Sequence, residues 1–260
     1  MKFKILLLNL VFILLSGRVV YGQAWEIGLG AGAAGYMGDL NPVNPLKISG
    51  ISGGVFAKYN FNPYWAFGLH YNYGRIAGDD SKSDNEDFRN RNLKFFTPLH
   101  ELSLQVDFNF LEYFAGGGTK RFSPYIYTGI GGVIFNPKVN YKGETRELRL
   151  YRTEDQSSPY KNYAISIPYG AGVKYNLKSN WSIFSQIGYR TAYTDYLDDV
   201  SGVYKMPDPN GDPVREYLSN PALDARTFGD QRGDSRKRDT YLFIQIGISY
   251  TFLSEKCFTF

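Results

Sequence analysis

Residues 241–252 read Tyr-Leu-Phe-Ile-Gln-Ile-Gly-Ile-Ser-Tyr-Thr-Phe, and apolar side chains alternate along them with small or polar ones. Successive side chains of an extended strand point to opposite faces, so this period of two indicates a β-strand. One face carries Leu242, Ile244, Ile246, Ile248, Tyr250 and Phe252, and the other carries Gln245, Gly247, Ser249 and Thr251. We therefore expect a strand with one apolar face.

The same alternation recurs along the chain. It is strong at 65–75, 101–110 and 163–175, and weaker at 25–36, 51–61, 124–135 and 181–193. Eight strands of about 10 to 13 residues exceed the usual ~5 to 6 residues of a soluble sheet and match the roughly 9 to 11 tilted residues of a bilayer crossing. Aromatic residues frame several strands, as Tyr163 and Tyr175 or Tyr241 and Phe252 do, in the manner of membrane-barrel girdles. The sequence thus predicts an all-β fold, an eight-stranded antiparallel transmembrane β-barrel.

The connections between these strands alternate in length. The shorter ones are 62–63, 111–123 and 176–180, and the longer ones are 37–50, 78–92, 136–162 and 194–239. Short periplasmic turns, longer extracellular loops and an even strand number describe an outer-membrane barrel with both termini on the periplasmic side. A soluble eight-stranded barrel or sandwich would also alternate. Its non-apolar face would be rich in Lys and Glu, whereas Gly, Ser, Gln and Asn dominate here.

The N-terminus has the pattern of an export signal. Lys2 and Lys4 precede a largely apolar run from Ile5 to Leu15, and small residues follow before Gln23. We expect residues 1–22 to be a cleaved signal peptide and residues 23–260 to be one barrel domain. Cleavage removes three of the 29 basic residues and no acidic one, leaving 26 against 25. The pI of 8.9 is therefore no argument for a nucleic-acid partner.

Composition excludes two further classes. The mean hydropathy of -0.33, together with the lack of a second long apolar run, argues against a bundle of membrane-spanning helices. Cys257 is the only cysteine, so an intramolecular disulfide is impossible and hydrogen bonds must hold the exported chain together.

The small or polar strand faces carry ionisable residues of both signs and one histidine. They are Glu26, Lys58, His70, Glu101, Asp107, Lys174 and Arg190. Since side chains just fill an eight-stranded barrel, we expect a paired polar plug instead of a channel lining. Hydrogen bonds would hold His70 there; the alternative is an acyl-transfer enzyme, for which no nucleophile motif is present. Residues 30–35 match G-x-G-x-x-G but lack the helix that dinucleotide binding needs, so these glycines relieve interior crowding.

Three acidic residues follow the strand at 181–193. Asp195, Asp198 and Asp199 offer the hard oxygen ligands that calcium prefers. The simpler interpretation is that they cap turns and bond to the backbone where the strand enters its loop. No His and Cys residues have metal-ligand spacing.

Two segments carry a resemblance to a known family. They are Gly38-Asp39-Leu40 and Thr194-Asp195-Tyr196-Leu197-Asp198-Asp199-Val200-Ser201-Gly202. With them, essentially the whole mature chain resembles the PorG-like outer-membrane barrels of the type IX secretion system of Bacteroidota. The resemblance implies a barrel that is not an enzyme and uses no cofactor. It also implies association with the periplasmic ring built from a lipoprotein and its partner, PorK and PorN.

We therefore expect an integral outer-membrane barrel that tethers this ring to the membrane during protein secretion. Its partners would be outer-membrane lipid and the ring proteins. The contact would lie on the periplasmic rim, at the turns 61–63, 111–123 and 178–180 and the tail 253–260. The competing hypothesis is a narrow porin-like barrel that binds a small solute or a lipid through loop 194–239 and the inward polar residues.

Overall fold

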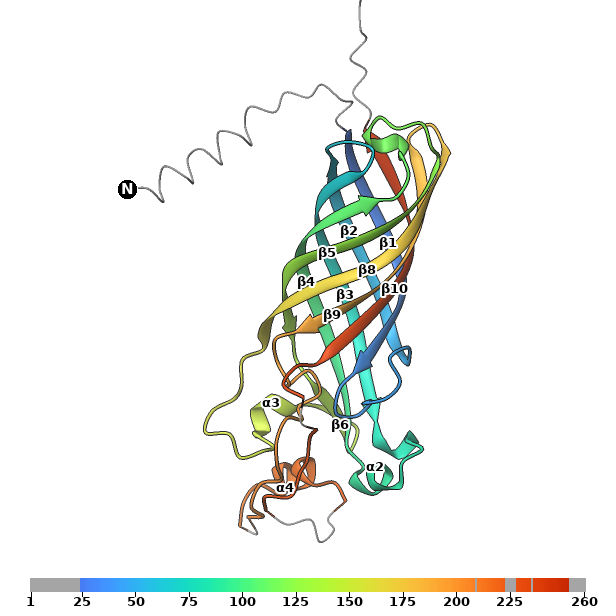
Figure 1. Ribbon diagram of the computed structural model, residues 1–260. Helices are drawn as coiled ribbons and strands as arrows, with labels where there is room; N and C mark the ends of the chain where they lie inside the picture. The colour runs from blue at the N-terminus through green and yellow to red at the C-terminus, as the bar shows by residue number, and fades with distance from the viewer. Residues whose placement is uncertain (1–23, 209, 223–227, 235, 253–260) are drawn as a thin grey trace, which may run out of the picture.

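The computed structural model describes residues 24–208, 210–222, 228–234 and 236–252, which form a β-barrel with a folded cap of loops at one end (Figure 1). The expected signal peptide 1–22, Cys257 and the tail 253–260 lie outside the described residues. The barrel strands are β1 (Ala24–Met37), β2 (Ile48–Asn60), β3 (Trp65–Asp79), β4 (Lys94–Asn109), β5 (Phe122–Phe135), β8 (Tyr163–Lys178), β9 (Trp181–Ala192) and β10 (Thr240–Phe252).

Each barrel strand pairs antiparallel with the next barrel strand along the chain, and β1 closes the ring against β10. The closing ladder runs in register from Trp25 opposite Phe252 to Met37 opposite Thr240. The predicted fold class and its eight strands are thereby confirmed. Because the ring is closed, no barrel strand presents an unpaired edge to the membrane.

Strands β3 and β4 run further than the sequence predicted. Their extra residues pair with each other up to Asp79 opposite Lys94, where the lysine Nζ lies 3.5 Å from Asp79 Oδ1. This extension continues into the loop end, beyond the part of the barrel that needs an apolar outer face. Its alternation is weaker in sequence for that reason.

The outer face of the barrel is apolar and exposed. Ile246 on β10 is 68% exposed and Ile130 on β5 is 56% exposed, as a lipid-facing belt requires. At ~3.3 Å per residue and a tilt of roughly 40°, the rise from Trp65 to Tyr73 on β3 is about 20 Å, near the ~25 Å apolar band of such barrels. A soluble barrel would bury this face, so the soluble alternative is wrong.

Aromatic girdles border the belt. Near the short turns Trp25 packs edge-on against Tyr59 with ring centroids 5.3 Å apart, and Trp181 packs likewise against Tyr250 at 5.1 Å. The expected framing role of Tyr241 is wrong, because this side chain points inward and is fully buried. An odd-numbered residue of β10 faces the interior, as Gln245 and Ser249 do.

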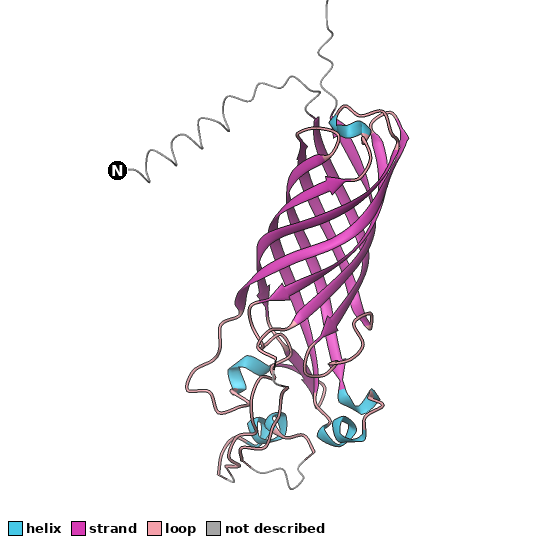
Figure 2. Ribbon diagram, in the orientation of Figure 1, coloured by secondary structure: helices cyan, strands magenta, loops and turns pink. Residues whose placement is uncertain are grey.

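The short connections lie at the end of the barrel where β1 begins and β10 ends, and the long loops lie at the opposite end (Figure 1). The long loops carry β6 (Lys138–Tyr141), β7 (Glu144–Glu147), η1 (Asp80–Lys82), α2 (Glu86–Arg91), α3 (Leu148–Tyr151) and α4 (Pro213–Ser219), whereas η2 (Phe114–Gly116) belongs to a short connection (Figure 2). None of the helices in the described ranges is long and apolar enough to span a membrane.

The main apolar core sits where the barrel meets the cap. Its barrel side chains include Leu99, Phe135 and Phe243, and its cap side chains include Leu197 and Leu218. The barrel is thus polar in its middle and apolar at its loop-side mouth, so the cap is seated on the barrel by burial of apolar surface.

Candidate functional site

Polar side chains fill the barrel between the two girdles. All seven inward residues that the alternation indicated are buried, and they enter from six strands: Glu26, Lys58, His70, Glu101, Asp107, Lys174 and Arg190. Three carboxylates and three basic groups make this set electrically balanced. A balanced interior avoids the large cost of burying unpaired charge.

Lys58 is held on two sides. Its Nζ lies 2.6 Å from Asp107 Oδ2 and 4.3 Å from the ring centroid of Phe56. Lys174 has no hydrogen-bond partner for its Nζ, which instead lies 4.6 Å from the ring centroid of Tyr113. Aromatic faces thus take part of the role that carboxylates would otherwise fill.

His70 departs from the expectation that hydrogen bonds hold it. Its Nε2 is buried without a hydrogen-bond partner, and its ring stacks on Phe56 with centroids 5.2 Å apart. The hydroxyl of Ser103, which faces His70 in the ladder, donates to Glu101 at 3.4 Å and accepts from Gln105 at 2.9 Å. The geometry is that of an aromatic stack.

A chain of hydrogen bonds crosses the lumen. The Tyr125 hydroxyl donates to Gln186 at 2.9 Å, the Gln186 amide donates to Gln245 at 3.0 Å, and the Gln245 amide donates to Asn72 at 3.3 Å. The Asn72 amide in turn donates to Glu101 at 3.3 Å. These residues come from five strands, so the network spans the barrel cross-section and obstructs it.

The motif at 194–202 forms the centre of the loop cap. Leu197 and Val200 join the apolar core, and the Tyr196 ring stacks on Tyr160 with centroids 4.2 Å apart. Asp199 accepts hydrogen bonds from the hydroxyls of Thr153 and Tyr160, both at 2.6 Å. The motif therefore joins two long loops, 136–162 and 194–239.

Glu154 and Arg232 complete this junction. The Ser201 and Gly202 amides donate to Glu154 Oε1 at 3.0 and 3.2 Å, and Arg232 Nη1 lies 2.9 Å from the same oxygen. Arg232 also donates to the Asp199 carbonyl at 2.7 Å. The Glu154 carboxylate thus serves as a common acceptor beneath the motif.

A second constellation lies at the base of the cap. Asp39, Asp198 and Asp239 each bring one carboxylate oxygen to within 4.8 Å of the others, and all three are buried. Asp39 follows β1, Asp198 belongs to the motif and Asp239 directly precedes β10. Among the described residues this is the one group of three such side chains close enough to hold a metal ion.

The structure separates the three calcium candidates of the sequence. Only Asp198 belongs to the group. It accepts a hydrogen bond from the Tyr36 hydroxyl and, as expected of a turn cap, another from the Val200 amide at 2.9 Å. Asp199 is engaged by Arg232, whose Nη2 lies 3.8 Å from its Oδ2, and Asp195 is half-buried outside the group. Spacing along the chain suggested one group, whereas in the structure only Asp198 lies close to two other carboxylates.

Burial raises the pKa of the clustered carboxyl groups. The pKa of Asp39 rises to about 7, chiefly through desolvation, while the backbone hydrogen bond from Asp234 opposes the rise. The pKa values of Asp198 and Asp239 lie well above the usual range for the same first reason, and the negative charges of the neighbouring cluster members add to it. The cluster thus favours protons, or a cation in their place.

Residues 38–40, one of the two segments that carry the family resemblance, adjoin this cluster. A Cβ atom at Gly38 would lie 2.2 Å from Asp239 Oδ1 and 2.3 Å from the Tyr36 hydroxyl oxygen. A larger residue there would displace the Asp239 carboxylate or the Tyr36 ring. Asp39 contributes the first carboxylate, and Leu40 packs into the apolar core beside it.

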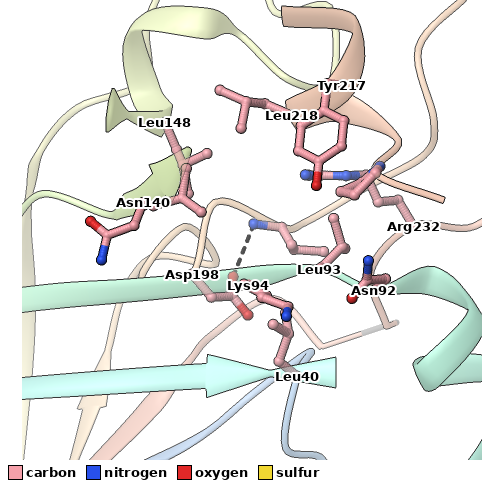
Figure 3. Close-up of a pocket in the computed structure, with 13 residues that line it drawn as sticks. Leu40, Asn92, Leu93, Lys94, Asn140, Leu148, Asp198, Tyr217, Leu218 and Arg232 are labelled. Carbon is pink, nitrogen blue, oxygen red and sulfur yellow. Dashed lines mark hydrogen bonds between the residues drawn. The ribbon is translucent and has the colours of Figure 1, made fainter. Parts of the chain in front are cut away.

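Two cavities border the cluster. One of about 180 Å³ is lined by Asp198, Arg232 and the apolar side chains of Leu40, Leu148 and Leu218 (Figure 3). The dashed line in Figure 3 is the bond from the Val200 amide to Asp198. A more open cavity of about 440 Å³ is lined in part by Asp39 and Asp234. Cluster members therefore line cavities on two sides.

The sequence pointed to some of these residues and missed others. Asp39 and Asp198 belong to the family segments, whereas Asp239, Glu154 and Arg232 were not singled out. Asp239 is the last residue of the predicted loop 194–239, and no local pattern connects it to Asp39 two hundred residues earlier.

Several solved outer-membrane barrels are similar to this chain. Ail of Yersinia pestis, in complex with the heparin analogue sucrose octasulfate, is 14% identical with a TM-score of 0.42, over 89% of this chain and 99% of that one. Neisserial surface protein A is 13% identical with a TM-score of 0.41, over 88% and 99%. OprG from Pseudomonas aeruginosa is 10% identical with a TM-score of 0.42, over 90% and 97%.

No curated protein matches the sequence significantly. One family model, described as "Domain of unknown function (DUF6089)", matches residues 5–260. This chain, an eight-stranded barrel closed by a loop cap, therefore belongs to the DUF6089 family.

Proposed function

We propose that this protein is a non-enzymatic structural component of the outer membrane that anchors the periplasmic ring of a type IX secretion system, built from PorK- and PorN-like proteins. The observation that carries the proposal is the sealed barrel. The hydrogen-bonded chain from Tyr125 to Glu101 crosses the lumen, and the loop cap packs on its mouth. A barrel whose described residues fill the lumen in this way is suited to holding a partner at the membrane.

The resemblance of segments 38–40 and 194–202 to PorG-like barrels supports the choice of partner. These segments build the junction of the cap, so the resemblance extends to residues with a defined structural role. It concerns the loop end, whereas a periplasmic ring would contact the opposite end.

The short-turn end offers a firm surface for such a contact. Tyr113 of the β4–β5 connection is buried and donates to Ser182 at 2.7 Å, which fixes the turn that contains η2 against β9. Lys120, Arg121 and Lys178 are exposed on this rim. A rigid, basic rim suits an acidic face of a ring protein.

Site-specific crosslinking tests the tether. A photoreactive amino acid is placed at Phe61, Lys120 or Ser179 on the short turns, and at Val43, 85% exposed in the first long loop, as the matched control. We expect crosslinks to the ring lipoprotein or its partner from the turn positions and none from Val43.

Gene deletion provides the second arm. We expect loss of secreted type IX cargo in the deletion strain and its recovery with the wild-type barrel. Normal cargo secretion in that strain, with no ring protein among the crosslinks, would overturn the proposed function.

A further inference from the structure

The acidic cluster of the cap lacks a counter-charge. Asp39, Asp198 and Asp239 are 3%, 2% and 1% exposed, so bulk water does not solvate their carboxylates. Within the described part of the chain, no Lys or Arg side chain forms an ion pair with any of the three. Arg91 is held by Asp80 at 2.7 Å and reaches Asp39 only at its backbone carbonyl, at 3.0 Å. Carboxylates buried in this way need protons or a cation.

Backbone amides orient each carboxylate through one oxygen. The amides of Asp234, Val200 and Leu197 donate to Asp39 Oδ1, Asp198 Oδ1 and Asp239 Oδ2 respectively. The second oxygen of Asp198 accepts a hydrogen bond from the Tyr36 hydroxyl. Three side chains aimed by the backbone in this manner form a preorganised set of ligands.

One of these second oxygens has no partner at all. Asp39 Oδ2 is buried and accepts no hydrogen bond. A buried carboxylate oxygen without a donor costs free energy, which a bound cation would recover. Gly38 keeps the adjoining space open, since a side chain there would collide with Asp239 Oδ1.

We propose that Asp39, Asp198 and Asp239 bind one Ca²⁺ ion at the base of the loop cap. The donor set is purely carboxylate oxygen, which suits a hard divalent cation. Calcium accepts roughly six to eight oxygen ligands in irregular geometry, and waters from the adjoining cavities would complete its shell. Magnesium demands a near-octahedral arrangement, which three loop-borne carboxylates supply less readily.

The ion would join three distant parts of the chain. Asp39 lies just after β1, Asp198 in the loop between β9 and β10, and Asp239 just before β10. Binding would therefore clamp the first and the last long loops to the barrel mouth. The proposal does not depend on a role in secretion.

Terbium luminescence and calcium titration test the site on the full barrel in detergent micelles after chelation. The Tyr36 hydroxyl bonds to Asp198, so this ring is placed to sensitise a bound Tb³⁺ ion. We expect saturable Tb³⁺ emission at one ion per barrel, which excess Ca²⁺ displaces, with a dissociation constant for Ca²⁺ of ~1 mM or tighter. Calcium should also slow proteolytic cleavage of the loop cap.

Isosteric amide variants locate the ligands. Asp39→Asn and Asp239→Asn should weaken Ca²⁺ binding by at least about tenfold. The matched control is Asp195→Asn, in the motif but outside the cluster, which should bind like the wild type. Heat-modifiable migration in gels verifies that each barrel is folded. Absence of saturable binding up to ~10 mM Ca²⁺, or wild-type binding by folded Asp39→Asn, overturns the proposal, as does a site that takes Mg²⁺ in preference to Ca²⁺.

Discussion

Lys58 and Asp107 form a close ion pair inside the barrel, where both side chains are shielded from bulk water. Strand parity was enough to predict that both side chains point inward. It did not predict that they would meet, since β3 separates Lys58 on β2 from Asp107 on β4, and the residue of β3 that faces Lys58 is Gly68. A glycine there lets the two side chains approach across a strand, and a Cβ would lie 2.6 Å from Lys58 Cγ.

Lys58→Met is expected to destabilise the barrel by ~3–5 kcal/mol, because it leaves the Asp107 charge buried without its partner. Urea unfolding in micelles, followed by tryptophan fluorescence, measures the change. Lys82→Met is the matched control: its side chain is 79% exposed and lies 4.0 Å from Asp79, so it should cost at most ~0.5 kcal/mol.

The double variant Lys58→Met/Asp107→Leu should recover much of the lost stability, because it removes both members of the pair and keeps the interior charge balanced. If Lys58→Met alone unfolds at the wild-type urea concentration, the pair has no structural importance and the prediction is wrong.

Strand β4 shows what an element encodes. Leu102, Leu104 and Val106 are exposed on its outer face, and Ser103, Gln105 and Asp107 are buried on its inner face. The apolar side chains of this strand face lipid, whereas those of a soluble protein face its interior. The period of two is visible in sequence because every second side chain meets the same medium along the whole crossing.

Leu104→Lys tests this orientation. Leu104 lies midway between the girdle residues Phe108 and His100, so a charge there would face the bilayer centre and cost ~2–4 kcal/mol. Folding yield into lipid vesicles and urea unfolding measure the cost.

The same substitution at Leu150, exposed on α3 in the loop cap, serves as the control and should change stability by no more than ~0.5 kcal/mol. Equal effects at Leu104 and Leu150 would contradict a membrane position for the barrel belt.

The short elements of the cap, which show no extended alternation of apolar and polar residues, were not predicted from the sequence. The β6–β7 hairpin turns at Lys142-Gly143, both with positive φ, and Asn85 and Asp212 cap the short helices α2 and α4. A turn with two positive φ values matches a type I′ hairpin, and Lys142 is not the Asn or Asp that usually announces one. Short capped helices depend on packing in the cap more than on their own sequence.

Two separate features of the molecule obstruct the barrel lumen. The polar network fills the middle, and the apolar core seats the cap on the mouth. A solute that passes through the lumen, as in a porin, would have to disrupt both the polar network and the apolar contacts of the cap. Loop 194–239, which binds the solute in the porin-like hypothesis, is bonded to loop 136–162 through Asp199, Glu154 and Arg232.

Purified barrel in planar bilayers is accordingly expected to show no steady conductance, because packed side chains and a hydrogen-bonded network fill the lumen. Single-channel recording tests this, with a known porin as the conducting reference in the same bilayers. Reproducible open levels at low voltage would favour the porin-like hypothesis over a structural anchor.

The membrane barrel, its eight strands, the seven inward ionisable side chains and the end that carries the long loops could all be predicted from the sequence. This was possible because a strand in lipid repeats one local rule every two residues. Which inward charges pair, that His70 stacks on Phe56, and that Asp39 and Asp239 join Asp198 in place of Asp195 and Asp199 became visible in the folded molecule alone. These contacts join segments up to two hundred residues apart, and the packing of the cap brings them together where no local period could announce them.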